Sequence, residues 1–144
     1  MLGVLIVKVK DRSSSALAIL SFAPRDLELT HVAIAEERGG IFGVAQVNVR
    51  ARDAELLKLF VEPTALRRGV GRTLFSWATD VAGKMNARRM IIEADPEAAG
   101  FYREMGARDA GEAPSGSLPG RMLPRLSFDV AQRATEARGR VCAS

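Results

Sequence analysis

Residues 59–74, LFVEPTALRRGVGRTL, contain the change of pattern that decides the fold. Up to Pro63 the apolar residues are spaced as in a β-strand, and after it they recur every three to four residues, as on one face of a helix. That face comprises Val70, Leu74, Trp77, Ala78, Val81 and Met85, and the polar face opposite comprises Arg72, Thr73, Thr79, Asp80 and Lys84. The stretch therefore predicts a strand ending at Val61, a short connection and a long helix.

The residues before this stretch predict an antiparallel meander. The runs with strand composition are Gly3–Lys10, Val32–Ala35, Ile41–Val49 and Glu55–Val61. Gly39-Gly40 lies between the second and third runs, which is typical of a hairpin turn, and Arg50–Asp53 predicts another turn. Ser13-Ser14-Ser15 ahead of Ala16–Leu20 predicts a short capped helix after the first strand.

The residues after the long helix extend the sheet. Arg88–Ala94 predicts a buried strand, and because it is reached through a helix it should run parallel to the strand ending at Val61. Asp95-Pro96-Glu97 predicts the capped start of a second helix, and Gly106 its end. A long loop rich in Pro and Gly should precede the last strand, Leu123–Val130. The chain is therefore expected to be an α/β protein (α+β by some schemes) with a mixed sheet.

Length and composition limit the class of protein. A chain of 144 residues and 15.5 kDa fits one domain, which we expect over residues 1–130, with 131–144 as a helical or disordered tail. The opening apolar run, Leu2–Val7, is far shorter than the ~18 residues of a membrane span, and no small-residue cleavage site follows it. The expectation is a cytoplasmic protein with no membrane partner.

The chain has one cysteine and one histidine, which excludes several kinds of covalent, metal and catalytic site. Cys142 is the only cysteine and His31 the only histidine, so neither an internal disulfide nor a Cys/His zinc site is expected. A Ser-His-Asp triad would have to use His31 and is nearly excluded. We interpret both residues as structural or incidental, and we expect no metal.

The charge balance favours an anionic ligand. The formal net charge is +4, the pI is 9.8, and 17 of the 21 basic residues are Arg, whose planar side chain suits phosphate and carboxylate. Codon bias explains the same excess equally well. Nucleic acid binding predicts a basic stripe with interleaved aromatic residues, and with only eight aromatic residues in the chain it is disfavoured.

The segment between strand and long helix, Leu66-Arg67-Arg68-Gly69-Val70-Gly71-Arg72, predicts an anion site. Glycines let successive backbone N–H groups face a ligand, the helix start adds partial positive charge, and the three Arg add full charges. An ordinary turn with solvated arginines is the alternative. A Walker loop fails because no Gly-Lys-Ser/Thr occurs, and a dinucleotide fingerprint fails because Leu74 replaces its third glycine.

A second pattern, Asp95-x-x-Ala98-x-x-Phe101-Tyr102-x-x-x-Gly106, lies on the second predicted helix. Phe101 and Tyr102 should both lean toward the sheet, near the carboxyl ends of the two parallel strands, where α/β sheets bind ligands. Taken alone, such a tyrosine is more often a core residue than a catalyst.

Together these segments resemble the GNAT superfamily of acyl-CoA-dependent N-acetyltransferases. The matching residues, in the order and spacing of the central motifs of that superfamily, are Leu59-Phe60-Val61-x-Pro63, Arg67-Arg68-Gly69-Val70-Gly71-Arg72-x-Leu74 and Asp95-x-x-Ala98-x-x-Phe101-Tyr102-x-x-x-Gly106. The resemblance extends from about Val32 to Val130. It implies a twisted mixed sheet, flanked by helices, whose central parallel strands splay apart to admit the pantetheine of acetyl-CoA.

The resemblance also implies a reaction and a set of site residues. An amine would attack the acetyl thioester directly, through a tetrahedral intermediate, with no metal. The residues implied to bind CoA are Leu59, Phe60, Val61, Arg67, Arg68, Gly69, Val70, Gly71, Arg72, Asp95 and Phe101. Tyr102 would face the sulfur, Glu55 or Glu93 would remove the amine proton, and a backbone N–H near Phe60 or Val61 would stabilise the oxyanion.

Departures from the family pattern lie at Leu66, where Gln or Arg is usual, at Asp95, where Asn is common, and at Ala107, where Phe is. Only residues 11–29 stand where members usually have two helices, so the acceptor is not identified beyond a small-molecule or peptide amine. We expect the loop 114–121 beside the acceptor. A homodimer is left open, and a non-catalytic CoA-binding regulatory domain is the alternative function.

Overall fold

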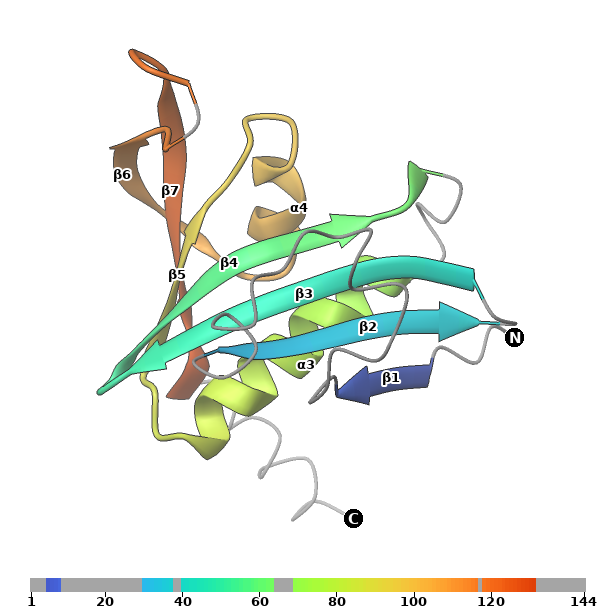
Figure 1. Cartoon of the computed structure of the whole chain (residues 1–144). Helices are drawn as coiled ribbons and strands as arrows, with labels where there is room; N and C mark the ends of the chain where they lie inside the picture. The colour runs from blue at the N-terminus through green and yellow to red at the C-terminus, as the bar shows by residue number, and fades with distance from the viewer. Residues whose placement is uncertain (1–4, 9–29, 38–39, 64–68, 117, 132–144) are drawn as a thin grey trace. The chain divides into compact units, whose positions relative to one another are not determined.

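The computed structural model describes residues 5–8, 30–37, 40–63, 69–116 and 118–131 (Figure 1). The predicted helix at Ala16–Leu20, the tail, Arg67 and Arg68 lie outside these residues. Within the described ranges, no helix is both long and apolar enough to cross a membrane.

The described strands form one mixed sheet in the order β1-β2-β3-β4-β5-β7-β6. The strands are β1 (Leu5–Lys8), β2 (His31–Glu37), β3 (Gly40–Arg50), β4 (Asp53–Val61), β5 (Arg89–Glu93), β6 (Arg108–Pro114) and β7 (Met122–Asp129), and the helices are α3 (Val70–Lys84) and α4 (Ala99–Glu104). Strands β4 and β5 are parallel, and the ladders β1–β2, β2–β3, β5–β7 and β6–β7 are antiparallel. The predicted mixed sheet with a parallel pair is therefore confirmed.

The chain divides into two compact units, which we describe separately. The first unit comprises residues 1–48 and 57–81, and thus β1, β2, most of β3, the end of β4 and most of α3. The second unit comprises residues 49–56 and 82–144, and thus the start of β4 together with β5, α4, β6 and β7.

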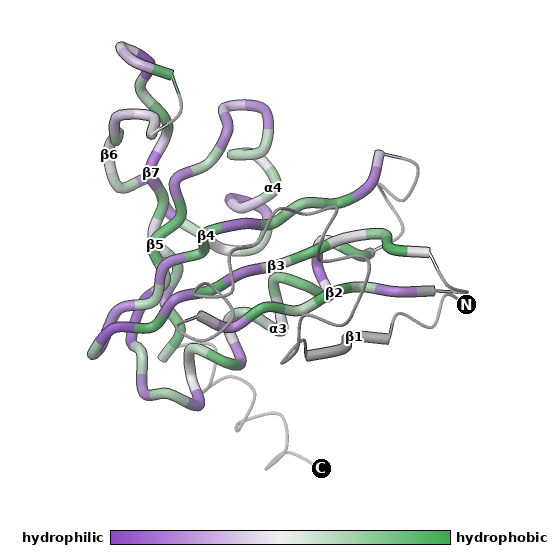
Figure 2. The backbone as a smooth tube through the Cα atoms, viewed as in Figure 1, coloured by the Kyte–Doolittle hydropathy of each residue, from purple (hydrophilic) through white to green (hydrophobic). Residues whose placement is uncertain are grey.

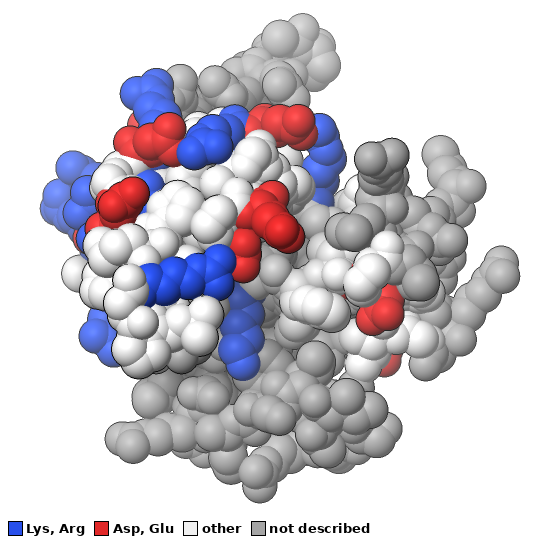
Figure 3. Space-filling view, turned by 90° about the horizontal axis from the view of Figure 1, so that it is seen from above, with Lys and Arg blue, Asp and Glu red and all other residues white. Residues whose placement is uncertain are grey.

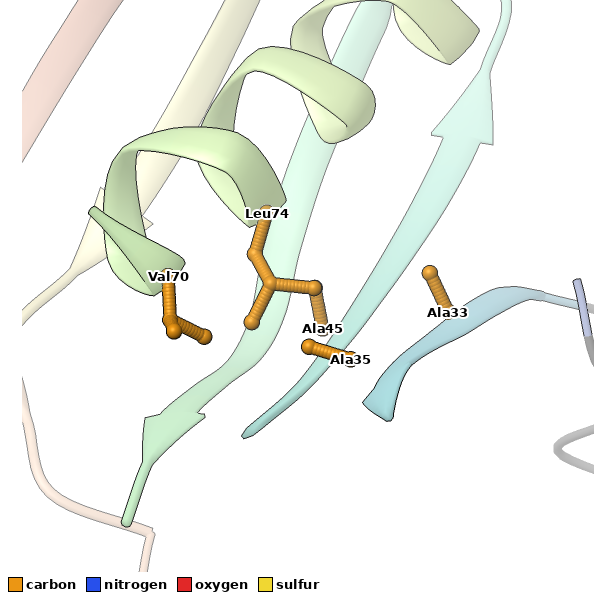
Figure 4. Packing of buried hydrophobic residues seen from close by; sticks show 5 residues of the cluster. All are labelled: Ala33, Ala35, Ala45, Val70 and Leu74. Atoms are coloured by element: carbon orange, nitrogen blue, oxygen red, sulfur yellow. The ribbon is translucent and has the colours of Figure 1, made fainter. Parts of the chain in front are cut away.

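In the first unit, α3 packs on the sheet through small side chains. Val70 and Leu74 point from the helix toward three alanines on the strands, Ala33, Ala35 and Ala45, and all five side chains are at most 3% exposed (Figure 4). Phe42, Leu59, Val61 and Trp77 are partly buried against this cluster. Alanines on the strands leave room for the helix to approach the sheet closely.

Helix α3 confirms the predicted periodicity, and hydrophobic and hydrophilic residues alternate along it (Figure 2). Two assignments of face were wrong. Thr79, predicted on the polar face, is 2% exposed, because its hydroxyl donates to the carbonyl of Ser76 (3.0 Å) and is thus satisfied without water. Met85, predicted on the inner face, is 44% exposed, because the helix ends at Lys84 and Asn86 has a φ of 66°.

Strand β4 changes the phase of its alternation halfway along. Ala54 and Leu56 are buried, as alternate residues of a strand should be, but Leu57 and Lys58 are both exposed. Leu59 and Val61 then pack against the core of the first unit. The buried side chains thus occupy even-numbered positions up to Leu56 and odd-numbered positions from Leu59, so the two parts of the strand bury different sets of alternate residues. The ladder with β5 covers Asp53–Leu56 against Arg89–Ile92, and β4 continues for five residues beyond it.

In the second unit, the sequence prediction missed β6, which it assigned to a long loop. Arg108–Pro114 has no β-branched or aromatic residue, and the strand exists because β7 provides a ladder for it. The register shifts between Asp109 and Glu112, where Gly111 has a φ of 98°. Pro114–Arg121 is therefore the tip of a hairpin, and the predicted last strand is confirmed as β7.

The start of α4 also differs from the prediction. The Asp95 carboxylate accepts a hydrogen bond from the N–H of Glu97 (3.0 Å), which forms a turn and not a helix cap. Residues 96–98 continue this turn, and the helix begins at Ala99. The predicted stop at Gly106 is confirmed by its φ of 108°, a value that favours glycine.

Candidate functional site

The end of β4 and the start of α3 come together within the first unit. Leu59 and Val61 point into the core that Val70 and Leu74 of α3 help to form, whereas Phe60 between them is 51% exposed. The N–H of Glu62 donates to the carbonyl of Phe42 (2.7 Å), which ties this end of β4 to β3. The two segments that the motif pattern selected therefore pack against the same core in the first unit.

Gly43 on β3 lies at the point where these elements meet. A Cβ atom at Gly43 would lie 2.8 Å from Cδ1 of Leu74, 2.9 Å from the carbonyl oxygen of Phe60 and 3.1 Å from Cγ1 of Val70. Two of these separations are shorter than real Cβ contacts. Only glycine lets both the β4 backbone and the first turn of α3 approach β3 so closely.

The first turn of α3 is suited to hold an anion. Gly69 has a φ of 82°, and no heavy atom of the described residues, its chain neighbours aside, lies within 4 Å of where its Cβ would be. Its carbonyl accepts from the N–H (3.0 Å) and hydroxyl (2.9 Å) of Thr73. The N–H groups of the first turn precede the hydrogen-bond ladder of the helix. No acidic residue lies in this turn, and Arg72 is exposed beside it.

Tyr102 is one of two buried residues of α4, with Ala99, in the second unit. It is 6% exposed, and its ring meets that of Phe101 edge to face, with centroids 5.2 Å apart at 69°. Burial raises the pKa of Tyr102 to about 12. The phenol thus keeps its proton over the whole physiological range.

The two glutamates predicted as general bases both belong to the second unit and lie on one face of the sheet. Ala54, Leu56, Met90 and Ile92 are buried, so Glu55 and Glu93, which alternate with them on β4 and β5, lie on the opposite face, and both are exposed. In register Glu55 is opposite Ile91, whereas Glu93 is opposite Arg125 of β7. The two carboxylates therefore have different neighbours.

The end of α4 lies on the other side of this part of the sheet. A Cβ at Gly106 would lie 3.4 Å from the ring of Phe128, which is 7% exposed and is paired with the buried Met90. The helix that carries Tyr102 thus packs on the buried face, and the two exposed glutamates lie on the opposite face. Asp95, predicted to contact CoA, is exposed, and its carboxylate lies 3.9 Å from the guanidinium of Arg121.

Acidic and basic side chains are mixed on the described surface. Figure 3 shows them next to one another on the face in view, and among the described residues Arg89 binds Asp53 through two hydrogen bonds (2.9 and 3.1 Å). These hydrogen bonds hold the pKa of Asp53 below its ordinary value. Arg103 pairs with Asp109 at 3.0 Å. On this face the described residues do not form the single basic stripe that nucleic acid binding predicts.

Gly43 is the residue of this site that the sequence interpretation did not select. A signal was present, because an isolated glycine inside an apolar strand often marks the close approach of another backbone. The sequence does not say which backbone approaches. Of the predicted CoA-binding residues, Arg67 and Arg68 lie outside the described part of the chain.

Comparisons with known proteins identify a family whose model matches and solved structures of similar fold. The family model described as acetyltransferase (GNAT) domain matches residues 28–106, and no curated protein matches. A Bacillus subtilis acetyltransferase in complex with CoA has 17% identity, a TM-score of 0.72, and coverage of 88% of this chain and 99% of its own. A GNAT acetyltransferase from Elizabethkingia anophelis with acetyl-CoA bound has 12% identity, a TM-score of 0.65, and coverages of 88% and 97%. The ribosomal-protein-S18-alanine N-acetyltransferase from Escherichia coli has 16% identity, a TM-score of 0.70, and coverages of 89% and 94%.

The burial of Tyr102 can be tested directly because it is the only tyrosine in the chain. We expect its phenolate absorbance to titrate with a midpoint of about 12, against ~10 after unfolding. Between these values the unfolded chain loses a proton that the folded chain keeps, so the free energy of unfolding should fall as pH rises. Titration of the folded protein by ultraviolet absorbance checks this, and a midpoint near 10 would contradict the burial.

Proposed function

Because the chain belongs to the GNAT acetyltransferase family, we propose that it transfers an acetyl group from acetyl-CoA to a primary amine. The observation that carries this proposal is the meeting of β4 and α3 within the first unit, fixed by the close approaches at Gly43. In this arrangement the end of β4 lies beside the first turn of α3, to which we assign the anion. The similar solved structures that hold CoA or acetyl-CoA support it.

The residues present fit the donor. The pyrophosphate of CoA needs N–H groups and positive charge, which the first turn of α3 offers through Gly69, Gly71 and Arg72. The pantetheine arm carries amides that need a strand as hydrogen-bonding partner. Leu59–Val61 is such a strand, because β4 extends beyond its ladder with β5. Bound acetyl-CoA would supply the activated acetyl group.

The acceptor amine must lose a proton before it attacks. A lysine-like amine with a pKa of ~10.4 is mostly protonated at pH 7, and neutralising it costs about 4.6 kcal/mol. We assign the general base to Glu55. Glu93 lies opposite Arg125, a cation that competes for its carboxylate, whereas Glu55 lies opposite the apolar Ile91.

Tyr102 serves as a hydrogen-bond donor toward the thiolate and not as an acid. With a pKa of about 12, transfer of its proton to a thiolate whose conjugate acid has a pKa of ~8.5 is uphill by about 5 kcal/mol. A donated hydrogen bond stabilises the developing negative charge without that transfer. The proton that finally reaches the thiolate comes from solvent. A backbone N–H near Phe60 or Val61 stabilises the oxyanion.

Binding of CoA is tested by one substitution at two matched glycines. Gly71 is the second residue of α3, and Gly100 is the exposed second residue of α4. Asp at either helix start is favourable for the helix itself. Gly71→Asp should weaken CoA binding by about tenfold to a hundredfold, because it puts a negative charge where the pyrophosphate belongs. Calorimetry at low salt measures the change, and equal CoA affinity in Gly71→Asp and Gly100→Asp would refute the assignment.

The general base is tested by the pair Glu55→Gln and Glu93→Gln. With an amine that the parent protein acetylates, Glu55→Gln should lower kcat at pH 7 by about 10²- to 10⁴-fold. Its rate should recover as pH rises toward the amine pKa, because solvent then supplies the neutral amine. Glu93→Gln should stay within about threefold of the parent. If Glu93→Gln produces the larger loss, the two roles are exchanged.

Replacement of Tyr102 by Phe separates an enzyme from a binding module. The variant keeps the ring and its contact with Phe101 and loses only the hydroxyl. We expect kcat to fall by about 10²-fold with CoA affinity unchanged. A structural tyrosine would instead lose only about 1–2 kcal/mol of stability. Acetyl transfer at the parental rate in the folded variant would remove Tyr102 from the mechanism.

A further inference from the structure

We infer that Gly43 is a positioning residue for the acyl donor, because its missing Cβ sets the spacing between the Phe60 carbonyl and the first turn of α3. The inference rests on the proposed function, since it assigns both of those groups to one ligand. We assign Gly43 no contact with CoA. It acts on CoA binding through the position of the β4 backbone and of the first turn of α3.

The three neighbours of Gly43 differ in how they could yield to a larger residue. Cδ1 of Leu74 is the end of a side chain that is 0% exposed and packed in the core of the first unit, so a shift of this atom disturbs the packing of α3. The Phe60 oxygen is backbone, and the hydrogen bond from Glu62 to Phe42 holds the end of its strand to β3. A Cβ at this position would therefore displace the strand end and the helix start and could not be absorbed by one rotamer.

CoA has to reach both the end of β4 and the start of α3, so its binding depends on the separation of these two elements. Pantetheine and pyrophosphate are parts of one molecule, so a strand that holds the first and a helix start that holds the second must keep a fixed separation. A small change in that separation weakens both contacts at once. Binding of the acceptor amine, which we assign to other groups, should not weaken to a comparable extent. Gly43 should thus affect the donor and not the acceptor.

The test is Gly43→Ala in the full chain, with CoA itself as the probe. We expect the Kd for CoA by calorimetry to rise about tenfold or more, while the KM for the acceptor changes less than about twofold. The emission of Trp77, the only tryptophan, should shift, because it packs against the cluster that holds Val70 and Leu74. A folded Gly43→Ala protein that binds CoA within twofold of the parent would overturn the inference.

Two control variants separate positioning from general destabilisation. At Gly83 of α3 a Cβ would meet, among the described residues, Cγ1 of Val130 at an ordinary 3.5 Å, so Gly83→Ala should leave CoA affinity unchanged. Ile92→Val removes one methyl group from the buried core of the second unit. It should lower the Tm without changing the Kd for CoA. If Ile92→Val weakens CoA binding as much as Gly43→Ala at a similar loss of Tm, positioning is excluded.

A double variant keeps the test decisive if Gly43→Ala alone does not fold. Leu74→Ala removes the 2.8 Å conflict and leaves the 2.9 Å conflict with the Phe60 oxygen. Gly43→Ala/Leu74→Ala should therefore fold and still bind CoA about tenfold more weakly than Leu74→Ala. Equal affinity in these two proteins would refute the inference. If the parent binds no CoA, the proposed function fails and the inference fails with it, whereas failure at Gly43 alone leaves the proposed function intact.

Discussion

Strand β4 contributes buried side chains to the cores of both units. The set of alternate residues that is buried changes between Leu56 and Leu59. In the first part of the strand Ala54 and Leu56 are buried in the second unit, and Glu55 between them is exposed. Beyond Leu56 the buried positions are odd-numbered, so that Leu59 and Val61 join the cluster of Val70 and Leu74, whereas Phe60 is exposed. This change follows directly on the last pair of the parallel ladder, Leu56 with Ile92.

The fold could be predicted from sequence where local pattern and tertiary demand agree. Helix α3, the β2–β3 hairpin and the parallel strand β5 have strong periodicity or turn residues, and the structure confirms them. Strand β6 has no such periodicity, and it forms because it pairs with β7, from Pro114 with Met122 to Arg108 with Ser127. Thr79 was assigned to the wrong face because a hydroxyl that bonds within its own helix behaves as an apolar group.

For the candidate site, motif spacing identified the strands and helices that carry the site residues. It did not identify the contacts that hold these elements in place. The end of β4 and the Gly69 turn were selected from sequence, and the structure brings these two together in the first unit. Tyr102, Glu55 and Glu93 were selected as well, and they belong to the second unit, where the helix of Tyr102 and the two glutamates lie on opposite faces of the strands. The role of Gly43 depends on three through-space distances, which no linear pattern contains.

The placement of the two rarest aromatic residues makes the chain its own pair of optical probes. Trp77 is the only tryptophan and belongs to the first unit, and Tyr102 is the only tyrosine and belongs to the second. Tryptophan emission and tyrosine absorbance therefore follow the unfolding of different parts of one molecule, with no label added. Coincident transitions would mean that the two units melt as one cooperative body, and separate transitions would give each unit a stability of its own.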